Sequence, residues 1–272
     1  MKKRYKTPVP KLEEPVLQTM LLAVCLENNT LEQAQAAIKR LETDFHDLNE
    51  VRVSSISELE TALKDQSDAE HRAHQLRNIL QYVFERNFSF EFESFRKKNV
   101  EQATKILNKI RNLSGFCKSY IMQHTLGSHI VPLDRQMTGS LIWLGVLEKG
   151  TSTDAGSEAI KSCIRKSDAA DFCHFLRYLG NEEKLKPYFH KAATTHSGEA
   201  FTLHDALHRL TDLFETSKHP PKTVERKKLV KKPTVKAAKP RRPATGAGAH
   251  KKVSKKATPA KKVAVKRTVK KK

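Results

Sequence analysis

Paired basic residues recur through the last fifth of the chain, separated mostly by Ala, Pro, Val and Thr. Each charged group can neutralise a backbone phosphate and release a condensed counterion, whatever the base sequence. No Phe, Tyr or Trp follows Lys218, so aromatic stacking on bases is not available there. The spacing predicts electrostatic binding to nucleic acid, without a preference between DNA and RNA. The residues expected to contact phosphates are Lys227, Lys228, Lys231, Lys232, Arg241, Arg242, Lys251, Lys252, Lys255, Lys256, Lys261 and Lys262.

The positive charge is confined to this one part of the chain. Residues 218–272 hold 22 Lys and Arg against a single acid, Glu225, and the whole chain of 272 residues carries a formal charge of +21, so residues 1–217 are electrically balanced. A segment so poor in apolar residues cannot offset its chain entropy by burial and is expected to be disordered. In composition it resembles the tails of linker histones and bacterial histone-like proteins. A solubility tail, a localisation signal and a site for anionic lipid or RNA remain alternatives.

A second set of residues with chemical potential lies near the middle of the chain. The segment Ser114–Lys118 is a short turn that contains Gly115, and Asp134 follows Pro132 and Leu133 at the start of a helical pattern. A turn that leads into a helix can bind a phosphate through backbone N–H groups, or it can simply join two helices. Asp134 can be a catalytic carboxylate or only a helix N-cap.

Helical periodicity predicts the elements that must position these residues. Apolar residues recur at three-and-four spacing almost throughout residues 13–217, and Thr30 with Gln33 forms a capping-box pattern. We find no convincing strand, fixed-period repeat or Gly-rich phosphate loop, so we predict an all-α domain over 13–217 between a basic N-terminal arm, 1–12, and the tail, 218–272. The expected helices cover 16–25, 30–41, 57–64, 71–84, 100–113, 134–146, 158–165, 169–179, 182–190 and 203–214, and 120–126 is an apolar segment in the least regular stretch of the domain.

Several function classes are not supported. The four cysteines lie within helical patterns and lack CxxC spacing, which favours buried thiols in a reducing compartment over disulfides. The longest apolar run, 20–26, is far short of a membrane span, and prolines and acids follow the basic start where a signal peptide would be apolar. His204 and His208 lie one turn apart without a third ligand at sensible spacing, so no metal site is predicted.

The central motifs resemble those of the helix-hairpin-helix DNA glycosylases of the endonuclease III type. That family carries Leu-Pro-Gly-Val-Gly between two helices and then an Asp that begins another helix, with a Leu-Gly pair a fixed distance later. The resemblance implies that a hairpin binds a phosphate beside the target nucleotide, which is flipped out of the duplex. It also implies that Asp134 stabilises the cationic sugar and activates water, and that Glu27 takes the position of the Gln that fills the space left by the base. The implied hairpin residues are Ser114, Gly115, Phe116, Cys117, Lys118 and Ser119.

The chain departs from this family pattern at several positions. Ser114 replaces the hairpin Pro, and Cys117 replaces its second Gly, where we expect a backbone position of positive φ. Ser119 replaces the lysine that forms a Schiff base in bifunctional members, so no lysine-dependent lyase activity is expected. The family's Thr-His and two helix arginines are also replaced, by Arg135, Gln136, Gly139 and Trp143. The four-cysteine loop of an iron–sulfur cluster is absent from the sequence given.

These observations favour a DNA-binding, base-excision repair protein that resembles a monofunctional DNA glycosylase. It is expected to act on double-stranded DNA as a monomer without a cofactor, and to lie inside the cell with the DNA, in a nucleoid or a nucleus. The alternative is a catalytically silent DNA-binding or chromatin-compacting protein that keeps the fold; Cys117, Glu27, Gly139 and Trp143 favour it. A membrane- or ribosome-associated basic protein rests on the tail alone. The damaged base is not specified by the sequence.

Overall fold

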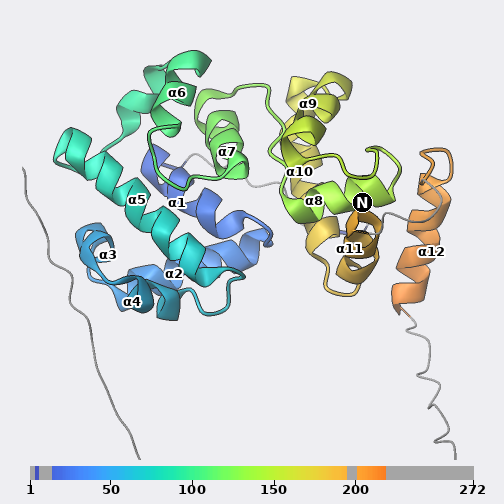
Figure 1. The fold of residues 1–272 in the computed structure, drawn as a ribbon, viewed down its shortest axis with the longest axis horizontal. Helices are drawn as coiled ribbons and strands as arrows, with labels where there is room; N and C mark the ends of the chain where they lie inside the picture. Colours follow the sequence, from blue (N-terminus) through green and yellow to red (C-terminus); the bar gives the residue numbers. More distant parts are fainter. Residues whose placement is uncertain (1–3, 6–13, 195–200, 219–272) are drawn as a thin grey trace, which may run out of the picture. The chain divides into compact units, whose positions relative to one another are not determined.

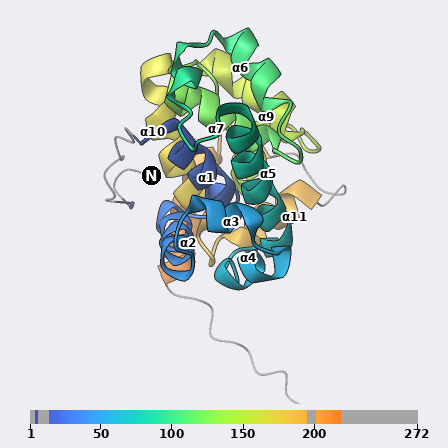
Figure 2. The same cartoon turned by 90° about the vertical axis from the view of Figure 1, so that its left-hand side faces the viewer.

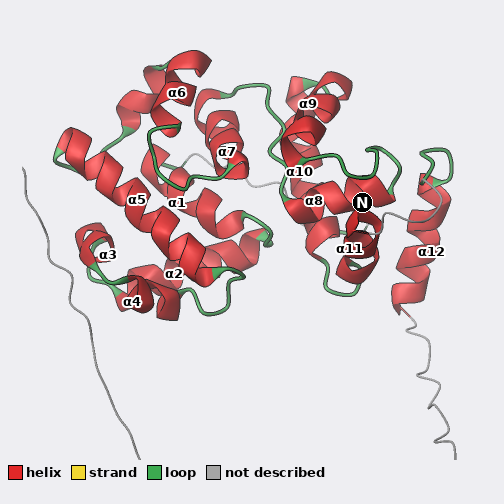
Figure 3. Ribbon diagram, viewed as in Figure 1, coloured by secondary structure: helices red, strands yellow, loops and turns green. Residues whose placement is uncertain are grey.

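A computed structural model describes residues 4–5, 14–194 and 201–218 of the chain. These residues belong to the first of two units into which the chain divides, Met1–Lys222 and Thr223–Lys272. Helices joined by loops make up the described part, which contains no strand (Figures 1 and 3), and this confirms the predicted all-α fold class. No helix within it is long and apolar enough to cross a membrane. The predicted tail contacts, from Lys227 to Lys262, lie outside the described residues.

The first helix, α1 (Val16–Leu26), is the centre of the N-terminal helices. Every residue of α1 except Gln18 is buried, because α2, α5 and α7 all pack against it (Figure 2). The Thr30–Gln33 capping box is confirmed at the start of α2. A second capping box, Ser55–Glu58, begins α4, two residues before the start that the sequence predicted. The helices of this group are α2 (Leu31–Asp44), α3 (Leu48–Val53), α4 (Ile56–Ala62) and α5 (Ala69–Asn87).

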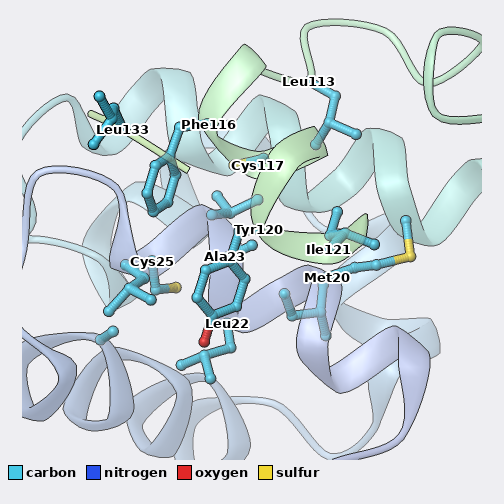
Figure 4. Packing of buried hydrophobic residues seen from close by; sticks show 14 of the residues in the cluster. Met20, Leu22, Ala23, Cys25, Leu113, Phe116, Cys117, Tyr120, Ile121 and Leu133 are labelled. Carbon is cyan, nitrogen blue, oxygen red and sulfur yellow. The ribbon is translucent and has the colours of Figure 1, made fainter. Parts of the chain in front are cut away.

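A 3-10 turn, η1 (Glu93–Lys97), leads into the helix pair that contains the predicted hairpin. This pair is α6 (Val100–Leu107) and α7 (Gly115–Leu126). The sequence predicted one helix to Leu113, but α6 ends at Leu107 and the chain turns before Asn112, whose φ is +60°. Figure 4 shows buried side chains of α7, such as Tyr120 and Ile121, beside those of α1.

The C-terminal helices pack around α8 (Arg135–Trp143). Gly139 of α8 allows the backbone of Phe189 in α11 to approach, because a Cβ there would lie 3.2 Å from the Phe189 carbonyl oxygen. Trp143 packs edge-on against the Phe189 ring and is buried, so it is a core residue. The other helices are α9 (Thr153–Cys163), α10 (Lys166–Asn181), α11 (Lys186–Thr194) and α12 (Ala206–Lys218).

Two residues of the predicted N-terminal arm are described, and both contact the C-terminal part of the domain. Arg4 and Tyr5 bind the carboxylate of Glu182, which is the C-cap of α10. The Arg4 guanidinium also lies 4.3 Å from the centre of the Phe214 ring of α12. This end of the arm is therefore held on the domain by a salt bridge, a hydrogen bond and a cation–π contact.

Candidate functional site

The N-terminus of α7 has the geometry of a backbone anion site. Ser114 is the N-cap, and its Oγ accepts a hydrogen bond from the N–H of Cys117 at 3.1 Å. The Lys118 N–H donates to the Ser114 carbonyl oxygen, while the N–H groups of Gly115 and Phe116 have no acceptor within the helix. Gly115 is exposed and lies at the positive end of the helix dipole, which favours an anion at this terminus.

The side chains of the hairpin are arranged differently from the family-based expectation. Cys117 lies in the first turn of α7 and is fully buried, and the residue of positive φ is Asn112. The predicted positive φ at Cys117 was therefore wrong, because the left-handed residue comes before the N-cap and leaves the first turn helical. Phe116 is also buried, so this residue and Cys117 can offer a ligand only backbone groups. Burial raises the pKa of the Cys117 thiol, which makes it a packing residue.

Two consecutive residues of the turn after α1 bind the N-caps of α7 and α8. The Oε2 of Glu27 accepts a hydrogen bond from the Ser114 hydroxyl at 2.8 Å, and the N–H of Asn28 donates to the Oδ2 of Asp134 at 2.9 Å. Asn28 adopts the left-handed conformation, with φ +58°. Arg72 of α5 stabilises the turn, because its guanidinium donates hydrogen bonds to the carbonyls of Val24 and Glu27. Segments far apart in the sequence therefore meet at this turn.

Asp134 is enclosed by the protein. It is the N-cap of α8, its Oδ1 accepts from the Met137 N–H at 2.8 Å, and its exposed fraction is 1%. Burial raises the pKa of this carboxyl group, whereas the backbone N–H of Met137, the charge of Arg177 and the N–H of Asn28 act to lower it. The capping role that the sequence offered as one alternative is present. The catalytic role of Asp134 remains a prediction.

Glu27 is a second carboxyl group at the same place. Burial raises its pKa, the Ser114 hydrogen bond and the charge of Arg72 lower it, and the negative charge of Asp134 raises it. The two carboxyl groups are therefore electrostatically coupled. Since Glu27 accepts a hydrogen bond from Ser114, the N-cap of α7, a change in its charge alters this hydrogen bond as well as the electrostatic interaction with Asp134.

Ser119, at the position of the family's Schiff-base lysine, lines a cavity of about 480 Å³. The cavity lies among α6, α7, α9 and the loop 128–130, and its polar lining includes His129, Asp154, Ser157 and Lys161. Lys118, the neighbouring residue, is not part of this lining and is half-buried. The hydroxyl of Ser119 cannot form an imine, so this cavity holds no Schiff-base nucleophile from that position.

Asp154 is a site residue that sequence reasoning did not find. A Cβ added to Gly115 would lie 2.9 Å from the Oδ1 of Asp154, so this carboxylate lies directly against the exposed glycine. Asp154 is in the first turn of α9, where an acid is a common helix-stabilising residue, and no motif marked it. Its negative charge opposes the binding of a phosphate at Gly115. No cluster of three or more potential metal ligands occurs among the described residues.

Comparisons with known proteins agree in fold and differ in sequence. No protein family profile matches the chain, and no match was found among curated proteins. Among solved structures, a trapped covalent intermediate of endonuclease III with DNA, the estranged-adenine complex, matches with a TM-score of 0.50 and 11% identity, over 65% of this chain and 80% of that one. A non-covalent endonuclease III–DNA complex matches with a TM-score of 0.49 and 13% identity, over 65% and 79%.

The described domain has the endonuclease III fold. The helix pair α6–α7 and the start of α8 are the elements that the sequence resemblance had singled out, and both are present in this order. At this level of identity the likeness concerns the fold alone, so the chemistry has to be argued from the residues.

Proposed function

We propose that this protein binds duplex DNA and excises damaged bases as a monofunctional DNA glycosylase of the endonuclease III superfamily. The observation that carries the proposal is the meeting of two helix N-termini at one turn: Glu27 binds the cap of α7 and Asn28 binds the cap of α8. This arrangement holds a phosphate-binding turn beside a buried carboxylate. A glycosylase needs both, one to hold the strand and one to act on the sugar.

The grip on DNA comes from two sources. The amides of Gly115 and Phe116 and the dipole of α7 offer one localised phosphate site. The basic residues of 218–272 supply the sequence-independent part of the affinity through counterion release. Because the α7 amides and the basic residues of 218–272 belong to one chain, a monomer is sufficient to bind DNA. The proposed location is inside the cell, with the DNA.

The chemistry centres on Asp134. When the bond between C1′ and the base nitrogen breaks, its electron pair leaves with the base and the sugar becomes an oxocarbenium-like cation. An ionised Asp134 stabilises that cation and accepts a proton from the water molecule that adds to C1′. The proton passes on to the departing base, which leaves a neutral free base and an abasic site. Because Ser119 offers no amine, the strand is not cut by β-elimination.

A second candidate, a catalytically silent DNA-binding protein, is favoured by one specific observation. Asp134 is 1% exposed and both of its carboxylate oxygens accept hydrogen bonds from the backbone, so a sugar reaches it only after the site opens. In this case the fold serves DNA binding or compaction, and the carboxylate serves only as a helix cap.

The decisive experiment is an excision assay on a panel of lesion-bearing duplexes, with protein from a host that lacks its own glycosylases. We expect alkali-labile abasic sites on at least one lesion, no strand cleavage without alkali, and no covalent adduct after borohydride treatment. Efficient trapping that is abolished by Lys118→Ala would show a lyase and contradict the monofunctional assignment. Absence of excision on every lesion would favour the silent DNA-binding protein.

A further inference from the structure

Helix α10 comes unusually close to the beginning of α8. A Cβ on Gly180 would lie 2.9 Å from the carbonyl carbon and oxygen of Gln136 and 3.1 Å from the Met137 nitrogen. Only glycine allows this approach without a shift of one of the two helices. The residues of α10 that share this face, one turn to either side, are therefore held beside the N-terminus of α8, where Asp134 is the cap.

Arg177 precedes Gly180 by three residues, so it lies on the same face of α10, and it is 5% exposed. Its guanidinium carbon is 5.8 Å from the centre of the Phe116 ring and 5.7 Å from that of Tyr120, so the group is sandwiched between α10 and the buried side of α7. Its Nε and Nη2 have no hydrogen-bond partner within the described part of the chain. A buried guanidinium without compensation is strongly unfavourable.

Two unpaired amide acceptors belong to residues that link α10 to the turn that binds Asp134. The Oδ1 of Asn28 and the Oδ1 of Asn181 are buried and also lack a partner among the described residues. Asn181 donates from Nδ2 to the Arg177 carbonyl at 3.1 Å and to the Asn29 carbonyl at 3.3 Å, and Asn28, next to Asn29, donates its N–H to Asp134. The unpaired acceptors therefore belong to residues that connect the helix of Arg177 with the turn that binds Asp134. Donors and acceptors left over at one buried place are the usual signature of bridging ordered water.

We propose that Arg177 is a positioning residue for Asp134, which holds this carboxylate in its charged form from the α10 side and binds the water that bridges to Asn28 and Asn181. The catalytic meaning of this arrangement rests on the proposed excision chemistry, since only an ionised carboxylate stabilises a sugar cation. The electrostatic pairing itself is a property of the folded protein.

The other charged and titratable groups that face Asp134 do not replace Arg177. Glu27, from the turn after α1, has the same sign of charge as Asp134. Cys173, on the same helix as Arg177, is a buried thiol whose pKa is raised to about 11, so it is neutral at physiological pH. The backbone N–H groups of Asn28, Gln136 and Met137 also favour the charged form. Arg177 is thus the cation among the groups that act on this carboxyl.

The test is a titration of the Asp134 side-chain carboxyl by ¹³C NMR in the full-length protein, with the resonance assigned through Asp134→Asn. Arg177→Met keeps the apolar stem of the side chain but removes the guanidinium and its charge, and should raise the pKa of Asp134 by about one unit or more. Arg135→Met is the matched control, because Arg135 is exposed and follows Asp134 directly in the chain. We expect a shift of a few tenths there, since solvent screens exposed charges.

An unchanged pKa of Asp134 in Arg177→Met, or a shift equal to that in Arg135→Met, would overturn the proposal. If Arg177→Met does not fold, Arg177→Gln is measured instead, because it is polar and uncharged, and the same upward shift is expected. Arg177→Lys, which keeps the charge, should restore most of the wild-type value.

Activity gives a separate readout. In an enzyme that excises bases, Arg177→Met should move the acidic limb of the kcat–pH profile upward with the same shift and leave Kd for duplex DNA within about two-fold. A wild-type protein without excision on any lesion would contradict the proposed function but leave the titration result intact. The two failures are therefore distinguishable.

Discussion

The N-termini of α7 and α8 are capped in the same way but lie in opposite surroundings. Each begins with a polar N-cap whose side-chain oxygen accepts a backbone N–H, and each cap is bound by one residue of the same turn, Glu27 or Asn28. Gly115 behind the first cap is exposed, whereas Asp134, the second cap, is 1% exposed. One terminus offers its amides to solvent, and the other keeps a carboxylate inside the protein.

The proposed function assigns phosphate binding to the first terminus and chemistry to the second. A phosphate needs accessible N–H groups, and Gly115 in the first turn of α7 is exposed. A carboxylate that must stay poorly solvated to stabilise a cation is better kept in the interior, as at α8, with Arg177 to offset its charge. Variants that change one terminus at a time, or that remove the basic tail, test whether the two termini contribute separately to DNA binding and to stability.

The largest effect should come from removing residues 219–272, which leaves α12 complete and deletes all but one of the 22 basic residues of the tail. DNA affinity at low salt should fall by ~100-fold or more, and the slope of log K against log salt should flatten by ~0.9 for each phosphate that the tail no longer neutralises. Fluorescence anisotropy across a salt series measures both. An unchanged salt slope would mean that the described domain itself neutralises the phosphates.

Ser114→Ala tests how firmly the α7 terminus is tied to the turn after α1. It removes an N-cap and leaves the half-buried Glu27 carboxylate without its hydroxyl donor, so the free energy of unfolding should fall by about 2 kcal/mol. Ser152→Ala is the matched control, since Ser152 caps α9 through a single bond to the Ala155 N–H. It should lose about 1 kcal/mol in urea unfolding. Equal losses for both variants would show that the Glu27 bond contributes nothing.

Glu27→Gln tests the acid that joins the two termini. The folded protein raises the pKa of Glu27, so ionisation of this group destabilises the fold as pH rises from about 4 through the folded-state pKa. The Gln variant keeps an acceptor for Ser114 and has no such group. Its stability relative to wild type should therefore increase over that pH range, by about 1.4 kcal/mol for each unit of pKa elevation. Glu101→Gln, which removes one acidic charge at an exposed position, is the matched control.

The smallest effect concerns the acid that lies against the phosphate site. Asp154→Asn removes a negative charge next to Gly115, and DNA binding by the protein that lacks residues 219–272 should tighten by ~3-fold. Asp168→Asn controls for the change, because Asp168 also lies in the first turn of a helix, α10, and is exposed. The same gain in both variants would indicate general charge repulsion and no special role for the α7 terminus.

Local patterns predicted what depends on neighbours in the chain. The helical periodicity predicted the all-α fold, and the pairing of Thr30 with Gln33 predicted a capping box that α2 contains. The position of Asp134 ahead of an apolar periodic segment predicted an N-terminus there, and α8 begins at the next residue. These features follow from hydrogen bonds and side-chain periodicity within one helix.

Contacts between distant segments could not be read from the sequence. Asp154 and Arg177 reach the site from α9 and α10, and helical spacing assigns a residue to a face without saying which helix covers that face. The early end of α6 and the left-handed Asn112 were not predicted, and the family pattern placed the positive φ at Cys117 instead. The Asn28–Asn29 pair was a usable signal, since Asn tolerates the left-handed conformation that Asn28 adopts.

Asp134→Asn separates phosphate binding at the α7 N-terminus from base excision at the α8 N-terminus. Asn caps a helix about as well as Asp, so the variant should fold normally. Single-turnover excision and Kd should be measured on the same lesion-bearing duplex for wild type and variant. We predict an excision rate at least ~100-fold lower with Kd unchanged or slightly tighter, since one electrostatic stabiliser and one negative charge are removed. Excision at the wild-type rate in Asp134→Asn would show that this residue is only a cap and would contradict the account.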